Sequence, residues 1–176
     1  MDLRPYSLLL AAALLLGGCV TPPPPLERPP SPLAEIASAF RETVEAIREE
    51  PDLHWHNGWM GNLWINTVGG ANRGLCYQWQ RRVYLGVLPT VRRVGWRAVG
   101  IVINRGTLHE HHAVVVFDER RIPLDTVLAR PDQAIWVLDA WRRGEPDIWP
   151  LELWLEIPLR VSVPPSLEDL AAVTGE

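Results

Sequence analysis

The segment from residue 21 to residue 32 limits the fold of this chain most strongly, because seven of its twelve residues are proline. Each proline fixes its φ angle and lacks a backbone N–H, so the segment can form neither a helix nor a central strand. It should extend instead as a polyproline spacer of about 3 Å per residue. The folded domain is therefore expected in residues 33–176, with residues 19–32 as a tether.

An apolar run from Ser7 to Leu16 precedes the proline segment. Its roughly ten residues are too few for a membrane-spanning helix of about 20, but they suit a signal peptide. The run ends in "LGGC", which resembles a bacterial lipobox. That resemblance implies removal of residues 1–18 and acylation of Cys19, for example with palmitate, which would anchor the protein to a membrane. Val20 at the next position favours the outer membrane, with the domain facing the periplasm. An ordinary signal peptide with an incidental cysteine is the alternative.

Charge and cysteine content narrow the possible partners. The formal net charge is −4, so no nucleic-acid partner is expected. The chain contains two cysteines. If Cys19 carries lipid, Cys76 has no disulfide partner within the chain. The Cys76 thiol is then inert in the core, reactive, or joined to another chain.

Periodicity predicts an α+β domain in which N-terminal helices pack on an antiparallel sheet. Residues 31–50 have apolar spacings of three and four, and a second helix should run from residue 75 until Gly86 and Pro89 end it. Residues 52–74 have no sustained period. Strands are expected at 96–104, 112–118, 134–139 and 151–160, followed by a short C-terminal helix capped by Ser166.

Three residue types suited to nucleophilic catalysis fall on these elements in a usable order. Cys76 follows a glycine turn at the N-terminus of a helix, where unpaired amides and the helix dipole stabilise a thiolate and an oxyanion. His112 opens a strand and is the candidate base. Asp139 ends the next strand and is the candidate acceptor that fixes the histidine tautomer.

The blocks "GLCYQW", "HHAVVVFD" and "WVLDAW" resemble the three core blocks of the transglutaminase-like fold, within the papain-like superfamily. The resemblance covers about residues 74–141 and implies a Cys76–His112–Asp139 triad. It further implies a cysteine peptidase or acyltransferase that acts on an amide bond of a protein or cell-wall peptide, with no cofactor. Asn72 stands where its amide could donate to the oxyanion, as a glutamine does in papain-like enzymes.

Several alternatives remain open at this stage. His111 precedes His112, so either could be the base, and Asp125 competes with Asp139 as the acid. Cys76 could be an inert core residue, since cysteine is among the most buried residue types. The same fold could then be a non-catalytic module that binds a peptide or an envelope partner. A metal-binding protein is the third possibility, with zinc held by the histidines at positions 54, 56, 109, 111 and 112.

Overall fold

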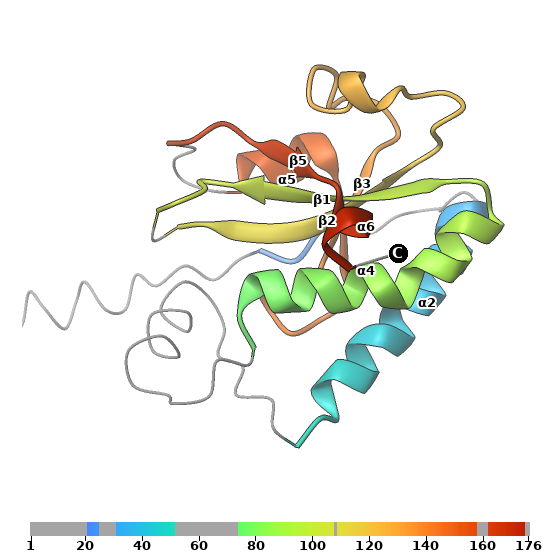
Figure 1. Ribbon diagram of the computed structural model, residues 1–176, viewed down its shortest axis with the longest axis vertical. Helices are drawn as coiled ribbons and strands as arrows, with labels where there is room; N and C mark the ends of the chain where they lie inside the picture. The colour runs from blue at the N-terminus through green and yellow to red at the C-terminus, as the bar shows by residue number, and fades with distance from the viewer. Residues whose placement is uncertain (1–20, 25–30, 52–73, 108, 158–161, 175–176) are drawn as a thin grey trace, which may run out of the picture.

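The computed structural model describes residues 21–24, 31–51, 74–107, 109–157 and 162–174, and these form an α+β fold (Figure 1). The elements, in chain order, are α2 (Ser31–Arg48), α4 (Cys76–Arg93), β1 (Arg97–Ile103), β2 (His111–Phe117), a 3-10 helix (Leu124–Thr126), β3 (Trp136–Asp139), β4 (Asp147–Pro150), α5 (Leu151–Glu156), β5 (Ser166–Glu168) and α6 (Leu170–Thr174).

The five strands form one open antiparallel sheet in the order β4-β3-β2-β1-β5. Strand β2 is central, pairing with β1 on one side and β3 on the other. The predicted combination of helices with an antiparallel sheet is confirmed. Strand β5 returns from the C-terminal region to pair with β1, which brings residues 166–168 beside residues 100–102.

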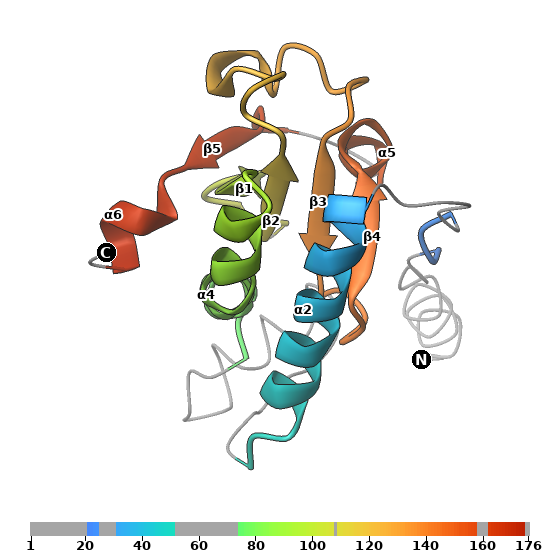
Figure 2. The ribbon, with the colours of Figure 1, turned by 90° about the vertical axis from the view of Figure 1, so that its right-hand side faces the viewer.

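Each face of the sheet carries its own apolar cluster. Helices α2 and α4 cover one face, where Val114 and Val116 point, and α5 lies on the other face, toward which Ala113 and Val115 point. Figure 2 shows α2 and α4 side by side in front of the sheet, with β5 and α6 beyond α4. Every residue of β2 is buried, as its continuous apolar run suggests.

The second helix is longer than expected. We expected Gly86 and Pro89 to end it, but α4 continues to Arg93 with Pro89 inside it. Pro89 is on the exposed side of the helix, while Val87, Leu88 and Val91 are buried around it. The free energy gained by burying these three side chains therefore outweighs the cost of the backbone hydrogen bond that proline cannot donate.

Two predictions near the C-terminus are wrong. Residues 151–156 form helix α5 instead of a strand, because Leu151 and Trp154, three positions apart, are both fully buried against the sheet. Ser166 does not cap a helix, because it begins strand β5, and only Leu170–Thr174 are helical there. Strand β4 was not predicted.

Candidate functional site

Cys76 is the first residue of α4, as its position after a glycine turn predicted. Gly74 has a φ of 101°, a conformation that glycine adopts without strain. The side chain of Gln78 folds back, and its Oε1 accepts hydrogen bonds from the amides of Gly74 (2.8 Å) and Leu75 (3.2 Å). This local cap fixes the chain that leads into the cysteine.

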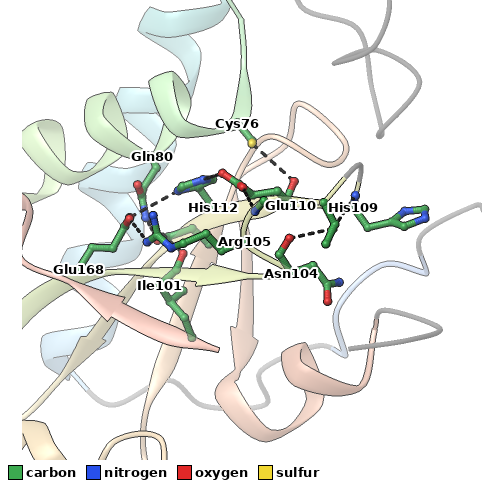
Figure 3. A network of polar contacts seen from close by, with 12 residues as sticks. Cys76, Gln80, Ile101, Asn104, Arg105, His109, Glu110, His112 and Glu168 are labelled. Atoms are coloured by element: carbon green, nitrogen blue, oxygen red, sulfur yellow. Dashed lines mark hydrogen bonds and ion pairs between the residues drawn. The ribbon is translucent and has the colours of Figure 1, made fainter. Parts of the chain in front are cut away.

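The Cys76 thiol points toward the start of strand β2. Its Sγ lies 3.9 Å from the backbone oxygen of Glu110, as Figure 3 shows. Cys76 is only 4% exposed and belongs to the core cluster under α4. Trp141 binds the turn that precedes Cys76, because its Nε1 donates to the Gly74 carbonyl at 2.8 Å.

His112 shares the α4 face of the sheet with Cys76, and its ring contacts that of Tyr77 edge-on at 6.3 Å between centroids. Its Nε2 donates to Glu110 Oε1 at 2.7 Å, and its Nδ1 lies 3.4 Å from Glu168 Oε2 (Figure 3). The second oxygen of Glu110 accepts from the Gly106 amide. Since a carboxylate only accepts, the Glu110 contact requires a proton on His112 Nε2.

The structure pairs Asp139 with the alternative histidine. We expected Asp139 to orient the base, His112 or else His111, and its Oδ2 accepts from His111 Nε2 at 2.8 Å. The register that pairs Val114 with Leu138 puts His111 and Asp139 on the sheet face away from α4. Adjacent strand residues point to opposite faces, so His112 cannot reach the same carboxylate. The competing acid, Asp125, is exposed in the 3-10 helix.

The His111–Asp139 pair is a buried polar cluster. Asp139 Oδ2 also accepts from Trp154 Nε1 (2.8 Å) and Arg142 Nε (2.9 Å). Burial raises the pKa of the Asp139 carboxyl, but His111, Arg142 and Trp154 outweigh burial and hold it well below its usual range. Burial, reinforced by Arg142, lowers the pKa of His111 despite Asp139. The pair is thus a neutral imidazole bonded to an ionised carboxylate.

Glu110 is an ionised carboxylate beside His112. Partial burial raises the pKa of Glu110. The Gly106 amide and His112 together lower this pKa by more than burial raises it, so it lies below the ordinary value. An ionised Glu110 can hold the His112 ring and stabilise an imidazolium. The sequence offered no signal for this role, because Glu110 and Glu168 meet His112 only through the β1–β2 turn and the β1–β5 pairing.

Helix α4 is tied to the sheet next to His112 by Gln80. The buried Gln80 Nε2 donates to the carbonyls of Ala113 (2.7 Å) and Ile101 (3.2 Å). A Cβ on Gly100 would lie 2.8 Å from that nitrogen, so only glycine leaves room for the amide. This contact sets the spacing between the helix that carries Cys76 and the strand that carries His112.

A groove of about 880 Å³ opens beside these residues. The first three turns of α4 form one wall, Glu110 and His112 lie at its base, and residues 168–170 form the other wall. Gly74 and Tyr77, which lie on either side of Cys76 in the sequence, both line it. The groove therefore starts near the thiol and follows α4.

Several predicted residues lie outside the described part of the chain: Cys19, Asn72, His54 and His56. Among the residues that the structure describes, no three histidine, cysteine, aspartate or glutamate side chains are grouped to hold a metal ion. In the same residues, no helix is both long and apolar enough to span a membrane.

Asp147 on β4 pairs with Asp139 on the neighbouring strand β3, and its titration should make the free energy of unfolding depend on pH. Burial and the charges of Asp139 and Glu145 raise its pKa to about 6, although Arg143 opposes them. The folded protein then binds a proton between about pH 4 and 6 that the unfolded chain has released, so this group makes stability fall as pH rises. We expect Asp147→Asn to gain stability relative to the natural protein across that window, measured by urea unfolding at pH 4 to 7. Asp125→Asn is the exposed control, and a profile for Asp147→Asn that parallels it would contradict the expectation.

The chain was also compared with known proteins. No family model, no curated protein and no solved structure matches it.

Proposed function

We propose that this chain is a lipid-anchored cysteine hydrolase or acyltransferase of the bacterial cell envelope, with a transglutaminase-like, papain-like fold. Its substrate would be an amide bond in a protein or cell-wall peptide. Cys76 is the nucleophile and His112 the base. Glu110 takes the orienting role that the sequence motif had suggested for Asp139.

One observation carries the proposal. The Cys76 thiol at the start of α4 contacts the backbone of Glu110, and the carboxylate of that same residue binds His112 Nε2 at 2.7 Å. The proposed base and its orienting acid are thus two positions apart at the start of β2, and the thiol contacts the backbone of that acid. His112 also lines the groove, whereas His111 contacts the rings of Trp141 and Trp154 and is not among the groove-lining residues.

The proposed reaction is acyl transfer. The His112 imidazole takes the thiol proton, and the Cys76 sulfur attacks the amide carbonyl carbon. The C–N bond breaks as the imidazolium returns that proton to the leaving amine, and a thioester remains on Cys76. His112 then removes a proton from water, which attacks the thioester and releases a carboxylic acid and the thiol. An amine in place of water would give transfer.

The pH dependence of Cys76 alkylation by iodoacetamide tests the assignment. The helix N-terminus and a His112 imidazolium should lower the thiol pKa below the free value of about 8.5. We expect His112→Ala to slow alkylation at pH 6 by roughly tenfold, since an activated thiolate loses its counter-charge. Glu110→Gln should have an intermediate effect because the ring loses its orienting charge. His111→Ala should leave the profile nearly unchanged.

Two results would contradict this assignment. One is an alkylation profile that changes in His111→Ala and Asp139→Asn but not in His112→Ala, which would make His111 the base in place of His112. The other is that the natural protein and all variants share one alkylation curve near the free-thiol pKa, or that Cys76 reacts only in denaturant. Either form of this result would rule out a catalytic cysteine.

The burial of Cys76 favours a second candidate, a non-catalytic module of the same fold that binds a peptide or an envelope partner. A 4% exposed thiol within an apolar cluster is also what a core cysteine looks like. In that case Cys76→Ser should lower stability by placing a hydroxyl in the core, with no loss of binding. The lipid anchor stays a prediction of the sequence, because Cys19 is not among the described residues.

A further inference from the structure

The wall of the groove formed by α4 has an ordered pattern. Tyr77, Arg81 and Leu85 are four residues apart, so they lie in one row along the helix, and all three line the groove. Tyr77 is 49% exposed and Leu85 is 40% exposed, and together they are two of the three large apolar side chains that are exposed in the described residues. These two side chains give the α4 wall exposed apolar contact points for a ligand.

Arg81 is the uncompensated charge of this groove. Four other charged residues line it, and each has a partner within the protein: Arg82 pairs with Glu50, Glu110 with His112, Glu168 with Arg105, and Asp169 caps the Ala171 amide. Within the described residues, Arg81 forms no hydrogen bond or ion pair with another side chain. The α4 wall thus presents an apolar group, a free cation and a second apolar group.

The spacing of this row matches an extended peptide. Four helical residues advance about 6 Å, and two residues of an extended strand advance about 6.6 Å. Side chains that point to one side of an extended chain can therefore meet Tyr77, Arg81 and Leu85 in turn. The groove volume of about 880 Å³ suits a ligand of about five residues.

We propose that this groove binds the substrate as an extended peptide with an acidic residue flanked, at alternate positions, by two apolar residues. The apolar side chain nearer the reacting bond packs on Tyr77, the acidic side chain pairs with Arg81, and the second apolar side chain packs on Leu85. This inference rests on the proposed function, because Cys76 next to Tyr77 defines which end of the groove holds the reacting carbonyl.

Binding can be measured separately from catalysis on the Cys76→Ala variant, by fluorescence anisotropy of two labelled peptides, Leu-Ser-Asp-Ser-Leu and Leu-Ser-Arg-Ser-Leu. We expect the aspartate peptide to bind roughly fivefold more tightly at low salt, and this preference should shrink in 0.5 M salt. Arg81→Glu should reverse the preference. Arg41→Glu makes the same charge change on the exposed surface of α2, outside the groove lining, and should leave the preference intact.

Two outcomes would overturn the inference. One is equal affinity for both peptides, and the other is a preference that Arg41→Glu removes as fully as Arg81→Glu. Neither outcome depends on whether Cys76 is a nucleophile. Conversely, suppose that the peptides bind with the expected preference while Cys76 fails the alkylation test. That result would support the groove as a peptide-binding site and contradict the proposed enzymatic function.

Discussion

Replacing Asp139 with alanine is expected to lower the free energy of unfolding by about 3–5 kcal/mol, the cost typical of breaking a buried ion pair from one side. A single oxygen, Oδ2, accepts from His111, Trp154 and Arg142, and the carboxylate is 1% exposed. Without it the Arg142 guanidinium keeps its charge but loses its partner, and the Trp154 N–H is left buried and unpaired. Asp139→Asn retains an acceptor oxygen and should fall between alanine and the natural protein.

Asp118 provides the matched control, because it has a similar set of contacts at the surface. It accepts from the backbone amide and the guanidinium of Arg120, whose side chain is 67% exposed. We expect Asp118→Ala to lower the free energy of unfolding far less than Asp139→Ala does, since exposed ion pairs contribute little. Urea unfolding of the three variants measures the difference. Equal losses for Asp139→Ala and Asp118→Ala would mean that the Asp139 cluster is hydrated in solution.

The elements that the sequence predicted correctly have local signals. The row of buried residues along α2 and the apolar run of β2 follow from periodicity, and the glycine turn before Cys76 predicts the start of α4. Residues 151–156 were predicted wrongly because "LELWLE" alternates leucine with other residues, as a strand would. The helix forms because Leu151 and Trp154 both reach the apolar cluster on the far face, and only the tertiary packing supplies that reason.

The candidate site was predictable only in part, because its contacts depend on strand register. The sequence identified Cys76, the histidine pair and Asp139, but which histidine meets Asp139 follows from the pairing of Val114 with Leu138. Shifting that register by one residue would exchange the faces. Glu110 and Glu168 had no signal, since isolated glutamates in a turn and an edge strand are usually solvated surface residues.

Gly100 is the position where stability and the site should be affected together. We expect Gly100→Ala to cost about 2–4 kcal/mol, through overpacking and the loss of buried hydrogen bonds. The added Cβ would lie 2.8 Å from Gln80 Nε2 and 3.1 Å from side-chain atoms of both Glu168 and Leu170. The Gln80 amide would have to leave the carbonyls of Ile101 and Ala113, which follows His112 directly.

A double-mutant cycle with Gln80→Ala identifies the cause. If the clash with the Gln80 amide dominates, Gly100→Ala should cost much less in a Gln80→Ala background, with a coupling of at least about 1 kcal/mol. Gly86→Ala is the control, because its Cβ would lie 2.3 Å from Thr43 Oγ1 in the α2–α4 contact, away from the sheet. It should also destabilise the fold, but additively with Gln80→Ala.

The same variants separate a merely structural glycine from one that positions the site. Because Gln80 ties α4 to β2 beside His112, both Gly100→Ala and Gln80→Ala should shift the pH profile of Cys76 alkylation toward that of a free thiol, under conditions where each variant remains folded. Gly86→Ala should leave that profile in place despite its lower stability. If Gly86→Ala shifts the profile as much as Gly100→Ala does, loosening of α4 as a whole is responsible, and Gln80 does not set the distance between the thiol and its base.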